Sequence, residues 1–178
     1  MNDDALRNLI RTIPDYPKPG ILFRDITTLL KDGDGWGEVV DRLVTRYGRS
    51  GITAVAGIEA RGFILGGAVA AGLGAGFIPI RKRGKLPAAV ESLDYQLEYG
   101  SDRVEVHRDA VDAGQRVLLV DDLIATGGTA VAARDLLRGL GAVVVEAAFV
   151  IELPALAGRA RLEATETPVH ALLAFDGH

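Results

Sequence analysis

Short runs of consecutive apolar residues alternate along the chain with segments whose apolar positions recur every three or four residues. The continuous runs predict strands and the periodic segments predict helices. The predicted strands are 52–58, 76–80, 117–120, 142–151 and 169–175, and the predicted helices are 4–13, one capped by Asp34 that ends near Tyr47, 62–72 and 129–140. Apolar strands that alternate with helices are typical of a parallel sheet covered on both faces. We therefore expect an α/β fold with a mainly parallel central sheet flanked by helices.

Two segments fall outside this alternation. Closely spaced prolines and a glycine break the chain after the first predicted helix, so residues 14–25 are expected to be irregular. Residues 84–95 show neither helical nor strand periodicity. Because no internal repeat or low-complexity linker divides the sequence, we expect a single domain that spans residues 1–178.

Composition narrows the classes of function. The chain has no cysteine, so disulfides and thiolate metal sites are ruled out, and its net charge of −4 disfavours nucleic acid as a partner. The apolar runs are interrupted by glycine and are shorter than the roughly 20 residues that a membrane-spanning helix needs. The first residues are acidic, unlike the basic start of a secretory signal. A cytoplasmic enzyme or binding protein, without a nucleic-acid or membrane partner, is the expectation.

The segment 116–130 joins an apolar strand to a loop rich in glycine and threonine. The strand is expected to stop at two adjacent carboxylates, Asp121 and Asp122, before the chain turns into a helix. Gly127 and Gly128 let the backbone approach an anion, and a helix N-terminus attracts negative charge. Paired carboxylates can accept hydrogen bonds from sugar hydroxyls or lie near Mg²⁺. Either feature alone also suits an ordinary capping turn, but together they predict a phosphorylated sugar.

Three predicted strands end in polar segments, at residues 59–62, 81–85 and 121–129. In parallel sheets the carboxyl ends of the strands share one edge, and ligands bind there. Residues 81–85 carry four positive charges in a chain whose net charge is −4. A solvated surface loop would explain the charge run by itself. Its place after a strand favours an anion site instead.

The sequence VDDLIATGGT at 120–129 resembles the motif with which type I phosphoribosyltransferases bind 5-phosphoribosyl 1-pyrophosphate (PRPP). The resemblance implies the type I phosphoribosyltransferase fold, with a small N-terminal hood at about residues 1–30 and a flexible loop at about residues 84–97. It implies that Asp121 and Asp122 contact the ribose hydroxyls. The residues implied to hold the 5-phosphate are Ala125, Thr126, Gly127, Gly128 and Thr129.

The same resemblance implies a second anion site, for the pyrophosphate of PRPP, with Mg²⁺ as the cofactor. Residues 57–63 are similar to the pyrophosphate loop of the family, which often has an unusual backbone geometry, although Ala60 stands where many members carry a small polar residue. Mg²⁺ is expected to be held mainly by PRPP oxygens and water, near Asp121 and Asp122. The residues assigned to the pyrophosphate are Glu59, Ala60, Arg61, Arg81, Lys85 and Tyr99.

Three further stretches, 14–27, 81–87 and 97–100, resemble the adenine phosphoribosyltransferases within this family. There a glutamate is proposed to handle the purine proton as N9 bonds to the sugar. Glu98 is therefore the candidate catalytic residue, since a purine that loses a proton needs a base within reach. The candidate adenine-binding residues are Ile21, Leu22, Phe23, Arg24 and Leu123.

The reaction implied is purine salvage, in which adenine and PRPP give AMP and pyrophosphate, in an enzyme that is generally a homodimer. One alternative is a transferase for another purine. Transferases for 6-oxopurines typically place a lysine at O6, for which Lys18 is a weak candidate. The second alternative is a non-catalytic regulator that binds PRPP or a purine. Such proteins usually add a DNA-binding segment, for which residues 1–13 are too short and acidic. Residues 154–178 carry no motif beyond apolar packing.

Overall fold

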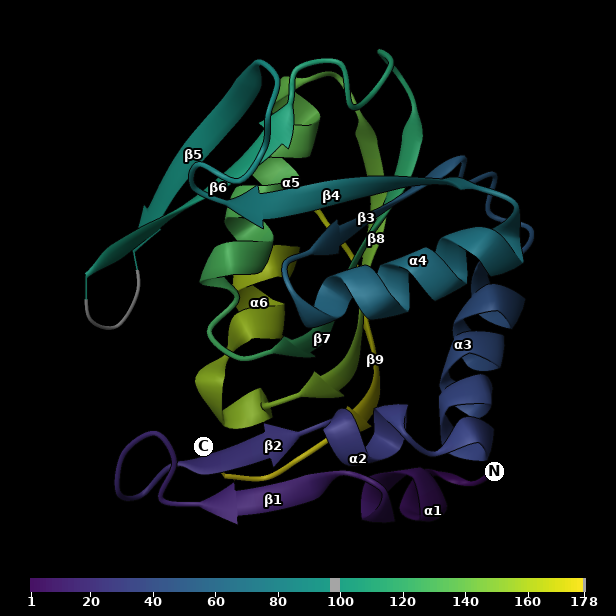
Figure 1. The fold of residues 1–178 in the computed structure, drawn as a ribbon, viewed down its shortest axis with the longest axis vertical. Helices are drawn as coiled ribbons and strands as arrows, with labels where there is room; N and C mark the ends of the chain where they lie inside the picture. Colours follow the sequence, from purple (N-terminus) through teal and green to yellow (C-terminus); the bar gives the residue numbers. More distant parts are fainter. Residues whose placement is uncertain (97–99, 178) are drawn as a thin grey trace.

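The computed structural model describes residues 1–96 and 100–177, which form a central sheet, its flanking helices and a separate hairpin (Figure 1). The helices are α1 (Asp3–Asn8), α2 (Thr27–Leu30), α3 (Gly33–Tyr47), α4 (Arg61–Leu73), α5 (Gly128–Gly139) and α6 (Gly158–Glu163), and η1 (Pro154–Leu156) is a 3-10 turn. The strands are β1 (Arg11–Pro14), β2 (Leu22–Asp25), β3 (Ala54–Ile58), β4 (Gly76–Lys82), β5 (Val90–Gln96), β6 (Ser101–His107), β7 (Arg116–Ile124), β8 (Val143–Glu152) and β9 (Val169–Ala174).

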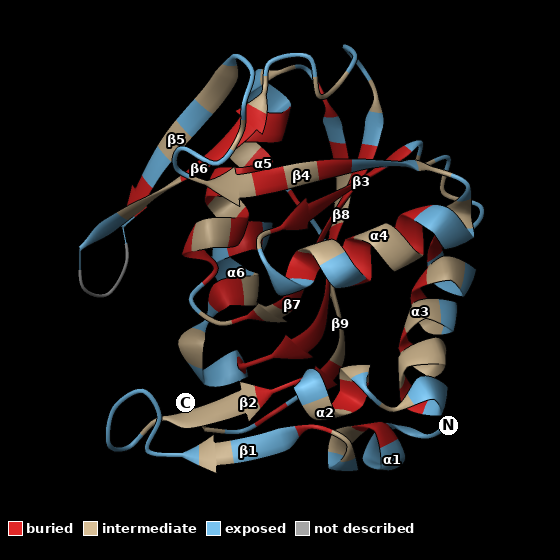
Figure 2. Ribbon diagram, viewed as in Figure 1, coloured by how far each residue is buried: buried red, intermediate tan, exposed pale blue. Residues whose placement is uncertain are grey.

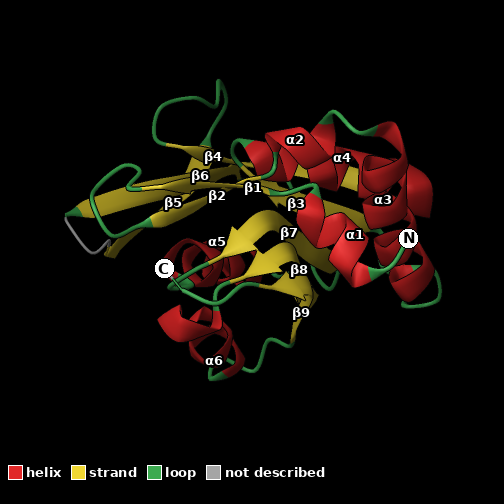
Figure 3. Ribbon diagram, turned by 90° about the horizontal axis from the view of Figure 1, so that it is seen from below, coloured by secondary structure: helices red, strands yellow, loops and turns green. Residues whose placement is uncertain are grey.

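The seven-stranded sheet has the order β5-β6-β4-β3-β7-β8-β9. From β4 to β9 along this order all neighbours are parallel, whereas β6 runs antiparallel to β4 and to β5. Helices cover both faces, with α3 and α4 on one side and α5 and α6 on the other (Figure 3). The predicted α/β architecture is confirmed. Because β3, β4, β7 and β8 are parallel, their carboxyl ends lie at the same edge.

The central strands are buried on both faces. Successive side chains of a strand point to opposite sides of a sheet. Leu119 of β7 therefore packs into the core under α5, and its neighbour Leu118 packs into the core under α3 and α4. Figure 2 shows β3, β7 and β8 as buried, whereas the hairpin of β1 and β2 is mostly exposed or intermediate. The sheet is thus a rigid frame for the segments that follow its strands.

The hood differs from its sequence-based prediction. The helix expected over 4–13 ends at Asn8, and its second half forms β1. The segment 14–25, expected to be irregular, contains β2, which pairs antiparallel with β1 so that Ile13 lies opposite Phe23. This pairing joins residues ten positions apart, so the local helical spacing of apolar residues does not decide the structure.

The segment 84–95 was predicted correctly only in its first half, because residues 90–95 belong to β5. This strand lies at the sheet edge and buries only Tyr95 within the segment, so its sequence lacks a clear alternation of apolar and polar residues. It pairs with β6, for which no strand was predicted. Whether this part of the chain moves stays a prediction.

Two boundaries also differ. β7 does not stop at the two carboxylates but runs to Ile124, because pairing with β8 continues through Leu123 and Ile124. α3 is capped by Asp32, whose Oδ1 accepts a hydrogen bond from the N–H of Gly35 at 2.8 Å, and not by Asp34.

Within residues 1–96 and 100–177, no helix has the length and apolar character needed to cross a bilayer.

Candidate functional site

The loop between β7 and α5 forms a cradle of backbone donors. None of the N–H groups of residues 125–130 donates a hydrogen bond to another described residue. α5 begins without a capping side chain and without an acid in its first turn, so its positive end is uncompensated. Such donors suit a phosphate group. The loop encloses a cavity of about 110 Å³, which is lined by Asp121, Leu123, Ile124, Ala125, Thr126, Gly127, Gly128, Thr129, Ala130 and Phe149.

Two glycines from distant parts of the chain give this loop its shape. Gly127 has a φ of 77°, in the left-handed region, and a Cβ there would lie 2.8 Å from the carbonyl oxygen of Gly158. Conversely, a Cβ on Gly158 would lie 2.2 Å from the carbonyl oxygen of Ala125. The start of α6 therefore packs directly behind the loop, with no room for a side chain at either position.

The two adjacent acids form a second, negatively charged part of the site. Asp122 is buried, and its Oδ2 accepts a hydrogen bond from Nε of Arg61 at the start of α4. Oδ1 of Asp121 accepts one from the N–H of Asp122 at 2.9 Å. Burial raises the pKa of Asp121 well above its ordinary value, and the neighbouring Asp122 carboxylate raises it further. A pair of hydroxyl donors or a divalent cation would stabilise these two adjacent carboxylates in their ionised form.

Gly62 brings α4 close to these acids. A Cβ at Gly62 would lie 2.9 Å from Oδ1 of Asp121 and 3.0 Å from the carbonyl oxygen of Val120. The glycine thus allows the first turn of α4 to approach the end of β7, and Arg61 reaches Asp122 from there. The Glu59–Ala60 peptide, which leads into this turn, is cis.

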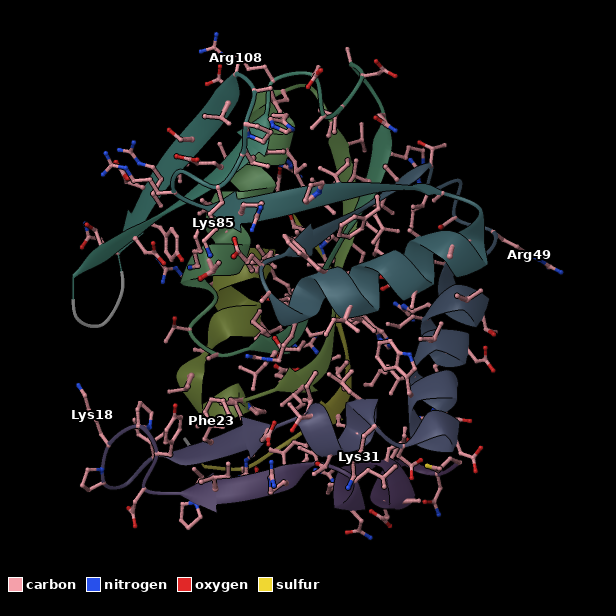
Figure 4. The ribbon with its side chains drawn as sticks, in the orientation of Figure 1. Lys18, Phe23, Lys31, Arg49, Lys85 and Arg108 are labelled. Carbon is pink, nitrogen blue, oxygen red and sulfur yellow. The ribbon has the colours of Figure 1, made fainter. Side chains whose placement is uncertain are left out.

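Cations gather around Glu59 at the end of β3. Its carboxylate accepts hydrogen bonds from the N–H of Lys82 at 2.9 Å, from Nε of Arg81 at 3.4 Å and from Nζ of Lys85. Partial burial alone would raise the pKa of Glu59, but these donors outweigh it and hold the pKa at about 2. Because the Glu59 carboxylate is ionised, it attracts the side chains of Arg81 and Lys85 and can orient them. Lys85 lies beside the end of β4 (Figure 4).

The hood contributes aromatic and apolar surface from β2. Leu22 and Phe23 are half-buried, and the Phe23 ring packs edge-on against Tyr16 with centroids 5.2 Å apart. Figure 4 shows Phe23 on β2, below the end of the sheet. The guanidinium of Arg24 donates a hydrogen bond to the carbonyl oxygen of Asp176 at 2.8 Å. The guanidinium of Arg24, one of the predicted adenine-binding residues, is therefore bound to Asp176.

The end of β2 is fixed by a buried acid. The carboxylate of Asp25 accepts hydrogen bonds from the guanidinium of Arg11 and from the N–H and hydroxyl of Thr27, at 2.9 and 2.8 Å. The bond from Arg11, followed by the bond from the N–H of Thr27, holds the pKa of Asp25 at about 2. This cluster ties the hairpin to α2 and so to the main core.

Comparison with known proteins agrees with this geometry. The family model for the phosphoribosyl transferase domain matches residues 30–170. The adenine phosphoribosyltransferase of Bradyrhizobium sp. (strain ORS 278) is 63% identical over 176 residues, which are 99% of this chain and 98% of the relative. The chain belongs to the adenine phosphoribosyltransferases.

Two solved adenine phosphoribosyltransferases share the fold of this chain. The enzyme of Rhodothermus marinus is 49% identical, with a TM-score of 0.91 and coverage of 97% of both chains. The enzyme of Saccharomyces cerevisiae, complexed with adenine and an imino-altritol bisphosphate, is 38% identical, with a TM-score of 0.89 and coverage of 96% of this chain and 97% of that one. The likeness spans the hood as well as the sheet.

The structure brings together most of the residues named from the sequence. Leu123, Asp121 and the predicted phosphate-binding residues line one cavity, and Asp122 lies behind it with Arg61. Glu59, Arg81 and Lys85 form a separate cluster, and Ala60 is the residue before α4. Glu98 and Tyr99 lie outside the described residues.

Sequence reasoning missed two parts of the site. Gly158 and Phe149 come from segments without a recognised motif, yet both lie against the phosphate loop. Gly158 is held there by Arg159, whose guanidinium binds the buried carboxylate of Glu152 at 2.6–3.0 Å. Glu152 is the last residue of the apolar strand β8, and Asp121 and Asp122 lie close to the end of the apolar strand β7. A fourth predicted strand followed by a charged residue was the signal that could have revealed this corner.

Proposed function

We propose that the chain transfers the 5-phosphoribosyl group of PRPP to N9 of adenine and releases AMP and pyrophosphate, a reaction of purine salvage. The observation that carries the proposal is the cradle of backbone N–H groups at residues 125–130, which donate to no other described residue, beside Asp121 and Asp122. A phosphate and a neighbouring diol match these two features. The yeast relative named above was solved with adenine and a bisphosphate, which supports the same class of ligands here.

The phosphate loop and the acids would hold the two ends of the ribose 5-phosphate. Backbone N–H groups and the hydroxyls of Thr126 and Thr129 bind the 5-phosphate, and Asp121 and Asp122 accept hydrogen bonds from the 2- and 3-hydroxyls. Arg61 keeps Asp122 oriented through the bond to Nε. Fixing the sugar at two points places C1 in one position, which converts an encounter in solution into an oriented reaction.

Mg²⁺ fits this site as an ion shared between protein and substrate. Within the described residues no group of three or more carboxylate or imidazole ligands is assembled, and Asp121 and Asp122 are the adjacent carboxylates that could contact the ion. A Mg²⁺ ion commonly keeps several waters and binds through one or two carboxylates plus substrate phosphates. When bound, it neutralises charge on the leaving pyrophosphate.

The cations at the ends of β3 and β4 are assigned to the pyrophosphate. Arg81 and Lys85 bind Glu59 and would turn toward the stronger anion when PRPP arrives, with Glu59 and Ala60 setting the position of this corner. Arg61 also lies at the edge where the pyrophosphate leaves, and Tyr99 is assigned there by resemblance. As the bond from C1 to pyrophosphate breaks, N9 of adenine bonds to C1 and the proton of the purine passes to a base. We assign that base to Glu98.

Adenine would lie between the hood and the phosphate loop. The backbone of Ile21 to Arg24 can donate to N1 and accept from the exocyclic amino group, and Phe23 and Leu123 can cover the two faces of the ring. Purines stack well on aromatic side chains. The guanidinium of Arg24 has other partners, so its contribution would come from its backbone.

We also propose a homodimer, in the cytoplasm. The side chains of Ile64 and Phe77 are 51% and 37% exposed, and Phe77 packs against Phe63 next to Ile64. Large exposed apolar residues on neighbouring elements suit a contact between protomers. Sedimentation velocity would show a dimer for the natural chain and a shift toward monomer for Ile64→Lys. A monomer at micromolar concentration would contradict the proposal.

Steady-state rates with four purines test the activity. With PRPP and Mg²⁺ present, we expect adenine to be used far better than hypoxanthine, guanine or xanthine. A preference for hypoxanthine would overturn the assignment of the base, and the absence of turnover with every purine would favour a non-catalytic regulator. Glu98→Gln should lower kcat by about 100-fold if Glu98 is the base. Turnover near that of the natural chain would remove Glu98 from the mechanism.

A further inference from the structure

We propose that residues 174–177, here called the tail, position the hood for adenine recognition. The proposal rests on the assignment of Ile21 to Arg24 to the base. The tail runs along β2 (Figure 1). Asp176 accepts a hydrogen bond from the guanidinium of Arg24 at 2.8 Å, and a Cβ on Gly177 would lie 3.2 Å from Cδ1 of Leu22. The tail therefore touches the strand that carries the candidate adenine-binding residues.

Phe175 is the centre of these contacts. Two guanidinium groups lie against its ring, that of Arg7 at 4.9 Å and that of Arg24 at 4.8 Å from the ring centroid. Arg7 also donates a hydrogen bond to the carbonyl oxygen of Ala174. A planar guanidinium on an aromatic face is attracted by the ring electrons and stacks with little loss of entropy. The ring thus adds a direct link between α1 and β2, which are otherwise connected through β1.

The tail is itself fixed to the central sheet. The N–H of Phe175 donates to the carbonyl oxygen of Glu152 at 3.0 Å, which continues the pairing of β9 with β8. The Phe175 side chain is only 8% exposed and belongs to the core cluster that includes Leu153 and Leu173. A movement of the hood away from the sheet would have to break these contacts. The tail therefore transfers the rigidity of the sheet to β2.

The hairpin needs such support. A two-stranded hairpin alone is marginally stable in water, and β1 is largely exposed. The cluster of Asp25, Arg11 and Thr27 fixes the end of β2, but Leu22 and Phe23 lie before it. The tail contacts the strand at Leu22 and Arg24, on both sides of Phe23. It is placed to set the position of the residues that would face adenine.

Loss of the tail contacts should weaken adenine binding selectively. If the hood holds its binding geometry for only about a tenth of the time, the apparent affinity for adenine falls about tenfold. PRPP is bound at the opposite side, by the loop at 125–130 and the two acids, so its affinity should change little. A general loss of stability would instead lower the fraction of active enzyme and leave both KM values unchanged.

The test compares Phe175→Ala and Phe175→Leu with Leu43→Ala. Leu43 is a fully buried residue of α3, so its truncation destabilises the fold without removing a residue of the tail or of β2. KM for adenine, KM for PRPP, kcat and the melting temperature are measured for each variant and for Arg7→Gln. We expect KM for adenine to rise about tenfold in Phe175→Ala and about threefold in Phe175→Leu and Arg7→Gln, with KM for PRPP within twofold. Leu43→Ala should lower the melting temperature and leave both KM values unchanged.

The outcomes separate this inference from the function on which it rests. An unchanged KM for adenine in Phe175→Ala, or equal rises in both KM values, would overturn the role of the tail. The proposed function would survive that result as long as the natural chain uses adenine and Phe23→Ala raises KM for adenine. If Phe175→Ala fails to fold, Phe175→Leu and Arg7→Gln give the same readout with a smaller change of volume.

Discussion

The phosphate loop and the hood, which face one another across the proposed ligand site, are built in opposite ways. The loop at 125–130 follows a strand buried on both faces, and its backbone donors come from consecutive residues, with Gly158 packed behind them. The hood is a mostly exposed hairpin whose position depends on α1, α2 and the tail. The family model matches residues 30–170, which include the loop and leave most of the hood outside. The part that binds the common substrate is thus locally encoded, and the part that selects the base is assembled from distant segments.

The largest expected effect would come from breaking the packing behind the loop. A Cβ in Gly158→Ala would lie 2.2 Å from the carbonyl oxygen of Ala125, so the loop must shift. Because a misplacement of about 1 Å can cost about 100-fold in rate, we expect kcat/KM for PRPP to fall at least 100-fold. Gly139→Ala is the control, since that position at the end of α5 has open space and should leave kinetics unchanged. Kinetics of Gly158→Ala like those of the control would contradict the account.

Removing the charge of Asp122 should have the next largest effect. Asp122→Asn keeps the shape but weakens the bond to Arg61 and to a ribose hydroxyl, so kcat/KM for PRPP should fall about 30-fold. Asp94→Asn is the matched control, because Asp94 pairs with Arg103 on the exposed edge hairpin. Initial rates at varied PRPP check the difference. A similar KM for PRPP in both variants would remove Asp122 from the binding site.

A smaller and more selective effect is expected in the hood. Phe23→Ala removes the ring proposed to stack on adenine, so KM for adenine should rise about tenfold while KM for PRPP stays within twofold. Phe23→Tyr keeps the aromatic face and should stay near the natural chain. Equal changes in both KM values would show that the two regions do not divide the substrates as proposed.

The same contrast explains what could be predicted from sequence. The central strands, α4 and α5 follow from their apolar patterns because they are largely buried, and the phosphate loop follows from the Asp-Asp and Gly-Gly pairs. The strands β1, β2, β5 and β6 were missed because most of them bury few residues, so their sequences lack a long apolar run. Gly158 and the tail residue Phe175 lack a local pattern, since their partners lie about 30 and 150 residues away.

The smallest predicted effect concerns the anchor of β2. The pKa of Asp25 is lowered in the folded chain to about 2, so its stabilising contribution is present above the unfolded value of 3.8 and is lost as pH falls toward 2. Asp25→Asn should therefore lower the free energy of unfolding by about 1 kcal/mol at pH 6. The value is modest because the Arg11 side chain is mostly exposed. The difference from the natural chain should shrink between pH 4 and about pH 2. Urea unfolding at several pH values checks this, and a constant difference would contradict it.

A crystal structure with AMP bound tests the central claim most directly, because AMP carries the phosphate, the ribose and the base in one molecule. The account predicts the 5-phosphate on the N–H groups of residues 125–130 and the ribose hydroxyls on Asp121 and Asp122. It predicts adenine against Phe23 and Leu123, with its edge on the backbone of β2. A phosphate bound instead by Arg81 and Lys85, or a base that does not touch the hood, would contradict the division between a locally encoded loop and an assembled hood.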